Sequence, residues 1–143
     1  MKISFLGDIS LNDNYNDLYQ SKKNPFKEIK QDISFSDLVI GNLECVAKVR
    51  KSRNLSKRPF LSTNYDTLNY LNDMNVNMVT LANNHIYDYL LDGYTSTINF
   101  LDKHNIENIG TKLLNEKKIN ENFIKQINDL RFCFLNYVSR DTN

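Results

Sequence analysis

Three polar residues that could do chemistry follow a short strand-forming run in the middle of the chain. Asn83, Asn84 and His85 come one residue after the run 78–81, which reads Met-Val-Thr-Leu. Two carboxamides and an imidazole at the end of a buried strand are costly unless each finds a partner. A metal ion, an anion or a hydrogen-bond network could supply that partner. Ligands of open α/β sheets bind outside the carboxyl ends of the strands, so this placement favours a site.

Polar side chains also end two earlier predicted strands. Asp8 follows residues 2–6, and Asn42 and Glu44 follow the apolar residues 38–40. Neighbouring parallel strands lie ~5 Å apart, so these side chains should gather at one edge of a sheet. Such an oxygen-rich set with one imidazole suits Mn²⁺, Mg²⁺, Fe²⁺ or Zn²⁺. The sequence therefore predicts a site for a divalent metal ion.

An imidazole beside a metal ion has an obvious use in this setting. The metal can lower the pKa of bound water and steady charge on a phosphoryl group. His85 could then protonate a leaving oxygen, and Asp88, three residues later, could fix the orientation of the imidazole. Each residue alone has a blander explanation, since an Asp after Gly is usually a turn residue and a His before a helix is usually a cap. The combination at three strand ends favours a site.

Residues 48–58 carry cations and no acids. One explanation is a solvated loop, and the other is an electrostatic guide for an anionic substrate. If the segment guides an anionic substrate, the residues expected to bind that substrate are Asn83, Arg50, Lys51, Arg53 and Arg58.

The whole chain limits the class of protein. With 143 residues and 41% hydrophobic content it has the size of one domain, and its net charge of +1 marks it as neither a nucleic-acid nor a membrane binder. No apolar run approaches the ~20 residues of a membrane span, and the apolar start is too short for a signal peptide. We expect a cytoplasmic protein, or an envelope-associated one if a leader or anchor has been removed. Cys45 and Cys133 should be free thiols.

Strand-like and helix-like segments alternate along the chain. Strands are predicted at residues 2–6, 38–40, 78–81 and 106–109, residues 9–24 and 112–120 should be mostly loop, and a hairpin should join residues 123–127 and 131–138 through Asn128-Asp129. Helices should begin at Pro25, after a cap at Ser62 or Thr63, and near Gly93. Their inward-facing residues should be Phe26, Ile29 and Ile33; Leu68, Leu71 and Met74; and Tyr94, Ile98 and Leu101. This order predicts an α/β fold with a mostly parallel sheet flanked by helices and a C-terminal β-hairpin.

Several of these segments together resemble the successive motifs of the CapA family. They are Gly7-Asp8, Asn42-Leu43-Glu44 and residues 81–88, Leu-Ala-Asn-Asn-His-Ile-Tyr-Asp, and the continuation through Gly93, Thr97, Leu101 and Gly110-Thr111 also fits. That family of capsule-synthesis and poly-γ-glutamate biosynthesis proteins is similar to the calcineurin-like metallophosphatases. The resemblance implies half of a metallophosphatase α/β sandwich.

The resemblance also implies roles for individual residues. Asp8, Glu44 and Asn84 would be metal ligands, Asn42 a neighbouring ligand or hydrogen-bond donor, and His85 the acid facing the leaving group. In a full-length protein, further ligands could add a second ion and make the metal centre dinuclear.

The chain departs from the family pattern in three ways. Family members usually have Gly directly after the Asp-Tyr that follows the His, whereas residues 90–92 precede Gly93 here. Ser10 stands where metallophosphatases carry a His. The later His ligands of that superfamily are absent, and His104 is the other imidazole of this sequence. We therefore expect residues 1–143 to form a single domain that is truncated at its C-terminus and has an incomplete site.

Three functions remain open at this stage. The first is a metal-dependent phosphoesterase that acts on a phosphoester in capsule or cell-envelope polymer synthesis. The second is a non-catalytic module that binds an anionic polymer or the capsule-synthesis machinery. The third is a polar cluster that only joins strand ends.

Overall fold

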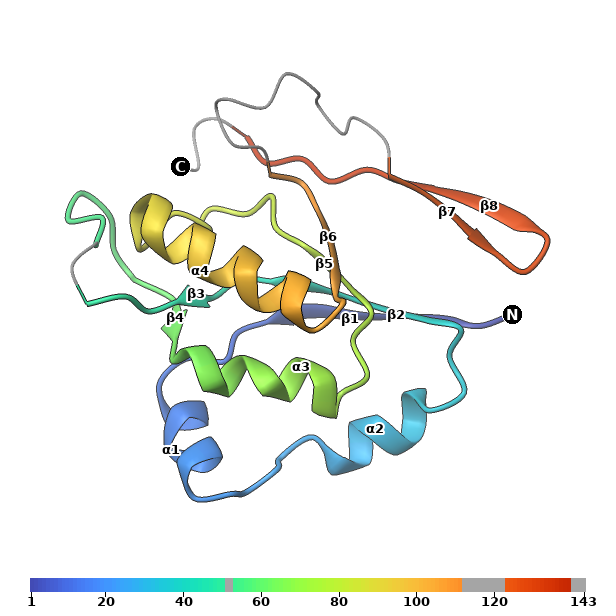
Figure 1. Ribbon diagram of the computed structural model, residues 1–143, viewed down its shortest axis with the longest axis horizontal. Helices are drawn as coiled ribbons and strands as arrows, with labels where there is room; N and C mark the ends of the chain where they lie inside the picture. Colours follow the sequence, from blue (N-terminus) through green and yellow to red (C-terminus); the bar gives the residue numbers. More distant parts are fainter. Residues whose placement is uncertain (51–52, 112–122, 140–143) are drawn as a thin grey trace.

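Apolar runs of the sequence form a parallel sheet at the centre of the computed structural model, which describes residues 1–50, 53–111 and 123–139. Its four described strands lie in the order β1-β2-β5-β6, and every neighbouring pair is parallel (Figure 1). They are β1 (Ile3–Ile9), β2 (Leu38–Leu43), β5 (Met78–Thr80) and β6 (Glu107–Ile109). The predicted α/β class is confirmed.

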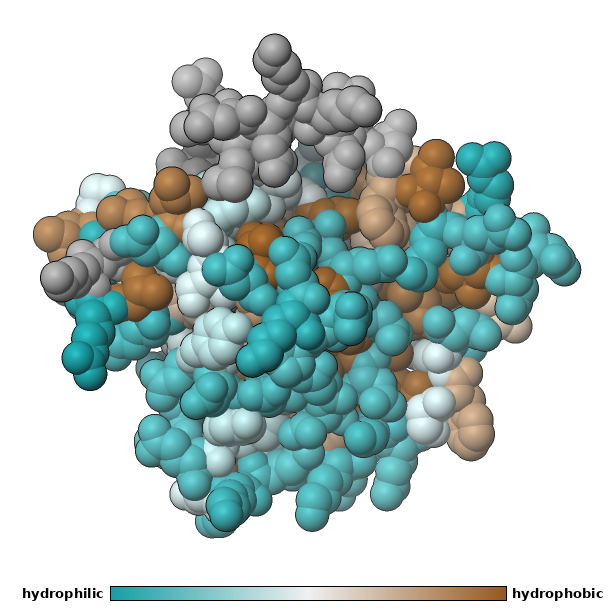
Figure 2. All heavy atoms as spheres, in the orientation of Figure 1, coloured by the Kyte–Doolittle hydropathy of each residue, from teal (hydrophilic) through white to brown (hydrophobic). Residues whose placement is uncertain are grey.

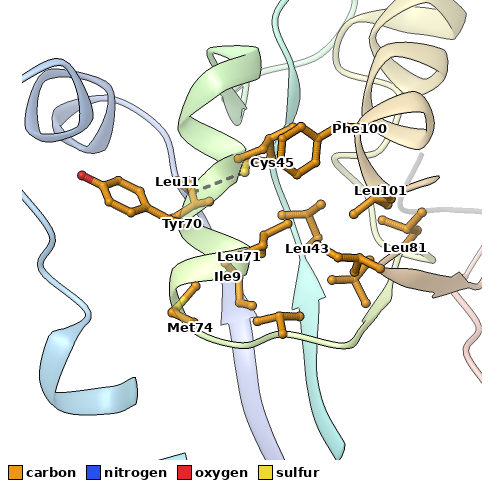
Figure 3. Close-up of a cluster of buried hydrophobic side chains, with 14 of the residues drawn as sticks. Ile9, Leu11, Leu43, Cys45, Tyr70, Leu71, Met74, Leu81, Phe100 and Leu101 are labelled. Atoms are coloured by element: carbon orange, nitrogen blue, oxygen red, sulfur yellow. Dashed lines mark hydrogen bonds between the residues drawn. The ribbon is translucent and has the colours of Figure 1, made fainter. Parts of the chain in front are cut away.

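The helices cover one face of this sheet. They are α1 (Asn14–Gln20), α2 (Lys27–Ile33), the 3-10 helix η1 (Tyr65–Asn69), α3 (Tyr70–Asp73) and α4 (Leu90–Lys103). Leu71 of α3 and Phe100 and Leu101 of α4 are fully buried in one cluster with Leu43 of β2 and with Leu81, which follows β5 (Figure 3). None of the described helices is both long enough and apolar enough to cross a membrane.

The predicted hairpin covers the other face. It consists of β7 (Phe123–Ile127) and β8 (Leu130–Phe134), which pair antiparallel around Asn128-Asp129. Ile127 packs on Ile40 and Met78 in a second apolar cluster. Hydrophilic residues dominate the surface near α1, α2 and α3, whereas hydrophobic residues appear beside the hairpin (Figure 2).

A second, smaller sheet was not expected. Within the described residues, β3 (Val46–Ala47) pairs in parallel with β4 (Ser62–Thr63). Ser62 and Thr63 therefore lie in a strand, and the predicted cap at these residues is wrong, since η1 begins at Tyr65 with no side-chain cap bond from Asn64. Strands of two residues are too short for their apolar periodicity to be recognised.

Other element boundaries also differ from the prediction. β1 continues through Gly7 and Asp8 to Ile9, α1 forms inside the predicted loop, and α4 begins three residues before Gly93. Ile29 is 39% exposed, so its predicted inward position is wrong. β8 ends at Phe134, before the predicted end of the strand, and the loop prediction for residues 112–120 lies outside the described part of the chain.

Candidate functional site

A β-bulge in β1 decides where Asp8 lies. Phe5 pairs with Ile40 and Asp8 with Asn42, so β1 has one more residue than β2 between these two pairs. Gly7, within this extra length, has a φ of 70°. Because successive strand residues point to opposite faces, one inserted residue moves Asp8 onto the face of Asn42.

Asn42 connects Asp8 to the end of β5. Its Nδ2 donates to Asp8 Oδ1 at 2.8 Å, and its Oδ1 accepts from Thr80 Oγ1 at 3.1 Å and from Asn83 Nδ2 at 3.2 Å. Both lone-pair directions of this carboxamide oxygen are thus used inside the protein. The geometry supports Asn42 as the hydrogen-bond donor that orients Asp8 rather than as a metal ligand.

Asn83 uses its whole side chain within the protein. It is 6% exposed, its Nδ2 also donates to Leu43 O at 2.9 Å, and its Oδ1 accepts from the backbone N–H of His85 at 2.9 Å. These bonds tie the loop after β5 to the end of β2. Asn83 was predicted to bind substrate, and its contacts instead suit a residue that holds the loop in place.

His85 and Asp88 form a buried pair. His85 Nδ1 lies 2.7 Å from Asp88 Oδ2, and the turn between them is closed by the Asp88 N–H donating to His85 O at 3.0 Å. An ionised carboxylate only accepts hydrogen bonds, so a neutral imidazole in this contact carries its proton on Nδ1. His85 Nε2, 3.3 Å from Asn84 Nδ2, is then the atom with the lone pair.

Glu44 and Asn84 lie at the same sheet edge without touching Asp8 in any hydrogen bond. The Glu44 backbone N–H donates to Ile9 O at 3.0 Å, which joins the residue after β2 to the end of β1. The carboxylate of Glu44 and the carboxamide oxygen of Asn84 make no hydrogen bond with other described residues, and both side chains are half-buried.

The oxygen atoms at these strand ends match the ligand preference of a hard divalent ion. Mn²⁺ and Mg²⁺ accept carboxylate and carboxamide oxygens as ligands. Asp8, Glu44 and Asn84 each have an oxygen that makes no hydrogen bond with other described residues. A group of three His, Cys, Asp or Glu residues close enough to hold a metal does not occur in the described residues. The fit therefore depends on the carboxamide of Asn84 as the third donor.

The cationic segment approaches the site through one lysine. Lys57 Nζ lies 3.6 Å from Asp88 Oδ1, which has no hydrogen-bond partner among the described residues. Arg53 stacks on Phe60 at 3.7 Å, and Arg50 and Arg58 are exposed. Lys51, also predicted to bind substrate, lies outside the described residues.

Two of the pockets lined by described residues help to place the candidate site. The smaller, about 250 Å³, adjoins Asp8 and is otherwise lined mainly by apolar residues, among them Phe26, Ile29 and Met74. The larger, about 520 Å³, lies among α1, η1 and α3, and none of the predicted site residues lines it.

The prediction missed Thr80 and Lys57. Thr80 ends β5 in register with Asn42, and a polar residue at the end of an otherwise apolar strand is the signal that could have identified it. Nothing in the sequence distinguishes Lys57 from the five other cations of residues 48–58.

Two comparisons with known proteins bear on this geometry. A family model described as "Bacterial capsule synthesis protein PGA_cap" matches residues 2–143. The chain is also similar to a protein of Bacillus subtilis (strain 168) named "PGA biosynthesis protein CapA", with 29% identity over 113 residues, which is 77% of this chain. The match spans 30% of the length of that relative.

Proposed function

We propose a function from one premise: the chain belongs to the family of bacterial capsule synthesis proteins PGA_cap, whose model matches residues 2–143. The proposal is that the chain supplies the metal-binding edge and the acid of a metal-dependent phosphoesterase in capsule or poly-γ-glutamate synthesis. The observation that carries it is the His85–Asp88 pair on the loop that follows β5. Asn83 joins this loop to the end of β2. Asn42 of β2 in turn donates to Asp8 of the neighbouring strand β1.

Three residues would hold the metal ion. Asp8 and Glu44 supply carboxylates, and Asn84 supplies a carboxamide oxygen next to His85. When bound, the ion supplies charge neutralisation at a phosphoryl group and a water that loses its proton near neutral pH.

The remaining chemistry falls to the protein itself. His85 donates through Nδ1 to Asp88, so Nε2 is the atom that can carry a second proton toward a leaving oxygen. The Asp88 carboxylate, fully buried, steadies the positive charge that the imidazole then has. Asn84 Nδ2, 3.3 Å from Nε2, limits where that nitrogen can point.

A second candidate is an anion-binding module without catalysis. The observation that favours it is the anchored cationic segment, in which Arg50 and Arg58 are exposed. Polyglutamate binding that falls steeply with salt, together with no hydrolysis and no Mn²⁺ binding, would favour this candidate.

Calorimetric titration with Mn²⁺ tests the first candidate. Asp8→Asn should weaken Mn²⁺ binding by about tenfold or more, since it removes a charged ligand. Glu28→Gln, an exposed acid on α2, removes the same charge and should leave the affinity unchanged. Failure of the wild-type chain to bind Mn²⁺ would contradict the proposal.

Hydrolysis of diphenyl phosphate tests the acid, because phenolate, unlike the better leaving group p-nitrophenolate, gains from protonation as it leaves. His85→Gln should lower turnover by about a hundredfold, the usual range for loss of a general acid, with Mn²⁺ affinity nearly unchanged. Equal turnover in wild type and His85→Gln would remove His85 from the mechanism.

A further inference from the structure

Asp88 contacts the cationic segment and the residues after it, in addition to its pairing with His85. Its Oδ2 accepts from Leu61 N–H at 2.7 Å, and its backbone carbonyl accepts from Asn54 N–H at 3.0 Å. Its Oδ1 faces Lys57 Nζ at 3.6 Å. One fully buried residue thus fixes residues 54–61 against the loop that carries His85.

Lys57 differs from its cationic neighbours. Its side chain is 18% exposed and turns inward, whereas Lys48, Arg50 and Arg58 are exposed and Arg53 lies on Phe60. A buried carboxylate is costly without a compensating charge, and the ammonium of Lys57 is the described cation that lies beside Asp88.

We propose that Lys57 is a positioning residue for His85 that acts through Asp88. The nearby ammonium keeps the Asp88 carboxylate a hydrogen-bond acceptor, and this acceptor holds the proton of the neutral imidazole on Nδ1. Nε2, which the Asn84 amide approaches at 3.3 Å, then keeps the lone pair that can take up the second proton. The inference deepens the proposed function, and the catalytic use of Nε2 rests on that function. The effect of Lys57 on the tautomer of His85 does not depend on catalysis.

The two imidazoles of the chain give a built-in comparison. His104 Nδ1 lies 2.9 Å from Asn72 Nδ2, which also donates to Asn69 Oδ1. The amide donor requires a lone pair on His104 Nδ1, so His104 should carry its proton on Nε2. His85 and His104 are therefore expected to be opposite tautomers.

Nitrogen-15 NMR of the histidine-labelled 143-residue chain, at a pH where both rings are neutral, reads these tautomers directly. In the wild type, the Nδ1–H form of His85 should dominate by about tenfold, since a hydrogen bond to a charged carboxylate is roughly twice as strong as a neutral one. In Lys57→Met it should fall to a mixture of the two tautomers, while His104 stays unchanged. Lys48→Met removes the same charge from an exposed position and should change neither ring.

Kinetics give a second arm. Lys57→Met should lower kcat about tenfold with a nearly unchanged KM, and Lys57→Arg should restore most of the loss. If His85 keeps the Nδ1–H tautomer in Lys57→Met, the inference is overturned whatever the activity. If the tautomer changes but no hydrolysis is seen even in wild type, the positioning link stands and the proposed function falls.

A variant that keeps a hydrogen-bond donor but no charge guards against unfolding of Lys57→Met. Lys57→Gln places an uncharged amide donor on the side of Asp88 Oδ1, so it should fold, yet it lacks the positive charge. The inference expects the same mixture of His85 tautomers in Lys57→Gln. A wild-type tautomer ratio in this variant would show that the charge of Lys57 has no part in positioning His85.

Discussion

Asp8 accepts a 2.8 Å hydrogen bond from Asn42 across the β1–β2 pair, and this contact depends on the one extra residue in β1. Without the bulge, strand alternation would place Asp8 on the helix-covered face, with Leu6. With it, Asp8 and Asn42 share the face that Thr80 also occupies. A local irregularity in one strand thus brings a carboxylate into the candidate site.

Gly7→Ala should therefore destabilise the protein through backbone strain alone. The φ of Gly7 is 70°, and a Cβ built there meets nothing within 4 Å, so no steric clash contributes. An L-residue in this left-handed region costs about 1–2 kcal/mol. Chemical denaturation of wild type and variant measures the loss in the free energy of unfolding.

Gly7→Asn is the matched control for strain at this position. Asn tolerates the left-handed region better than Ala, so it should recover part of the lost stability. Equal stability of wild type and Gly7→Ala would mean that the bulge does not need this backbone conformation.

The elements that carry the site could be predicted, but several details that shape it could not. The apolar runs at residues 38–40 and 78–81 identify two central strands, and parallel order then brings their ends together. Gly7-Asp8 predicts the end of a strand equally well as a bulge, because both use glycine at positive φ. Lys57 reaches Asp88 across 31 residues of sequence, a contact that no local pattern encodes.

Mutation of the adjacent residues Asn83 and Asn84 to Ala should lower the free energy of unfolding by different amounts. Asn83→Ala leaves Leu43 O and the His85 N–H without their buried partner and should cost about 1–3 kcal/mol of unfolding free energy. Asn84 is half-buried and contacts only His85 Nε2 among the described residues, so Asn84→Ala should change stability by less than about 0.5 kcal/mol.

Mn²⁺ affinity should also distinguish these two variants, but here Asn84→Ala should show the larger effect. Asn84→Ala should lose Mn²⁺ affinity, since the proposed carboxamide ligand is gone, while folded Asn83→Ala should keep a measurable affinity. Urea denaturation and calorimetry on both proteins test this pair. Two variants with the same stability and the same Mn²⁺ affinity would contradict the assignment of different roles.

Thr97 should stabilise the small sheet of β3 and β4, whose strands flank the cationic segment in sequence. Its Oγ1 accepts from the Ala47 N–H of β3 at 2.9 Å and donates to Gly93 O in α4 at 2.9 Å, and the residue is fully buried. Thr97→Val keeps the shape but strands the Ala47 N–H, which should cost about 1–3 kcal/mol. Thr95→Val, on the exposed side of α4, should be nearly neutral in the same denaturation experiment.

The two cysteines should differ in reactivity. Cys133 is exposed, whereas Cys45 is buried and accepts a hydrogen bond from the Leu11 N–H at 3.3 Å (Figure 3). Burial raises the pKa of Cys45 from 9.0 to about 12, so its thiol stays protonated in the folded protein at neutral pH. A disulfide reagent should titrate one thiol in the native chain and two after unfolding.

The same pKa predicts how stability depends on pH. Above pH 9 the Cys45 thiol ionises in the unfolded chain but not in the folded one, so the unfolded state gains stability as pH rises toward 12. Burial also raises the pKa of Tyr70 and Tyr87, which acts in the same direction. Comparison with Cys45→Ala isolates the thiol, since the tyrosines are present in both proteins. Wild type should lose about 1.4 kcal/mol relative to Cys45→Ala between about pH 8 and about pH 10, and parallel curves for the two proteins would show that the Cys45 pKa is not raised.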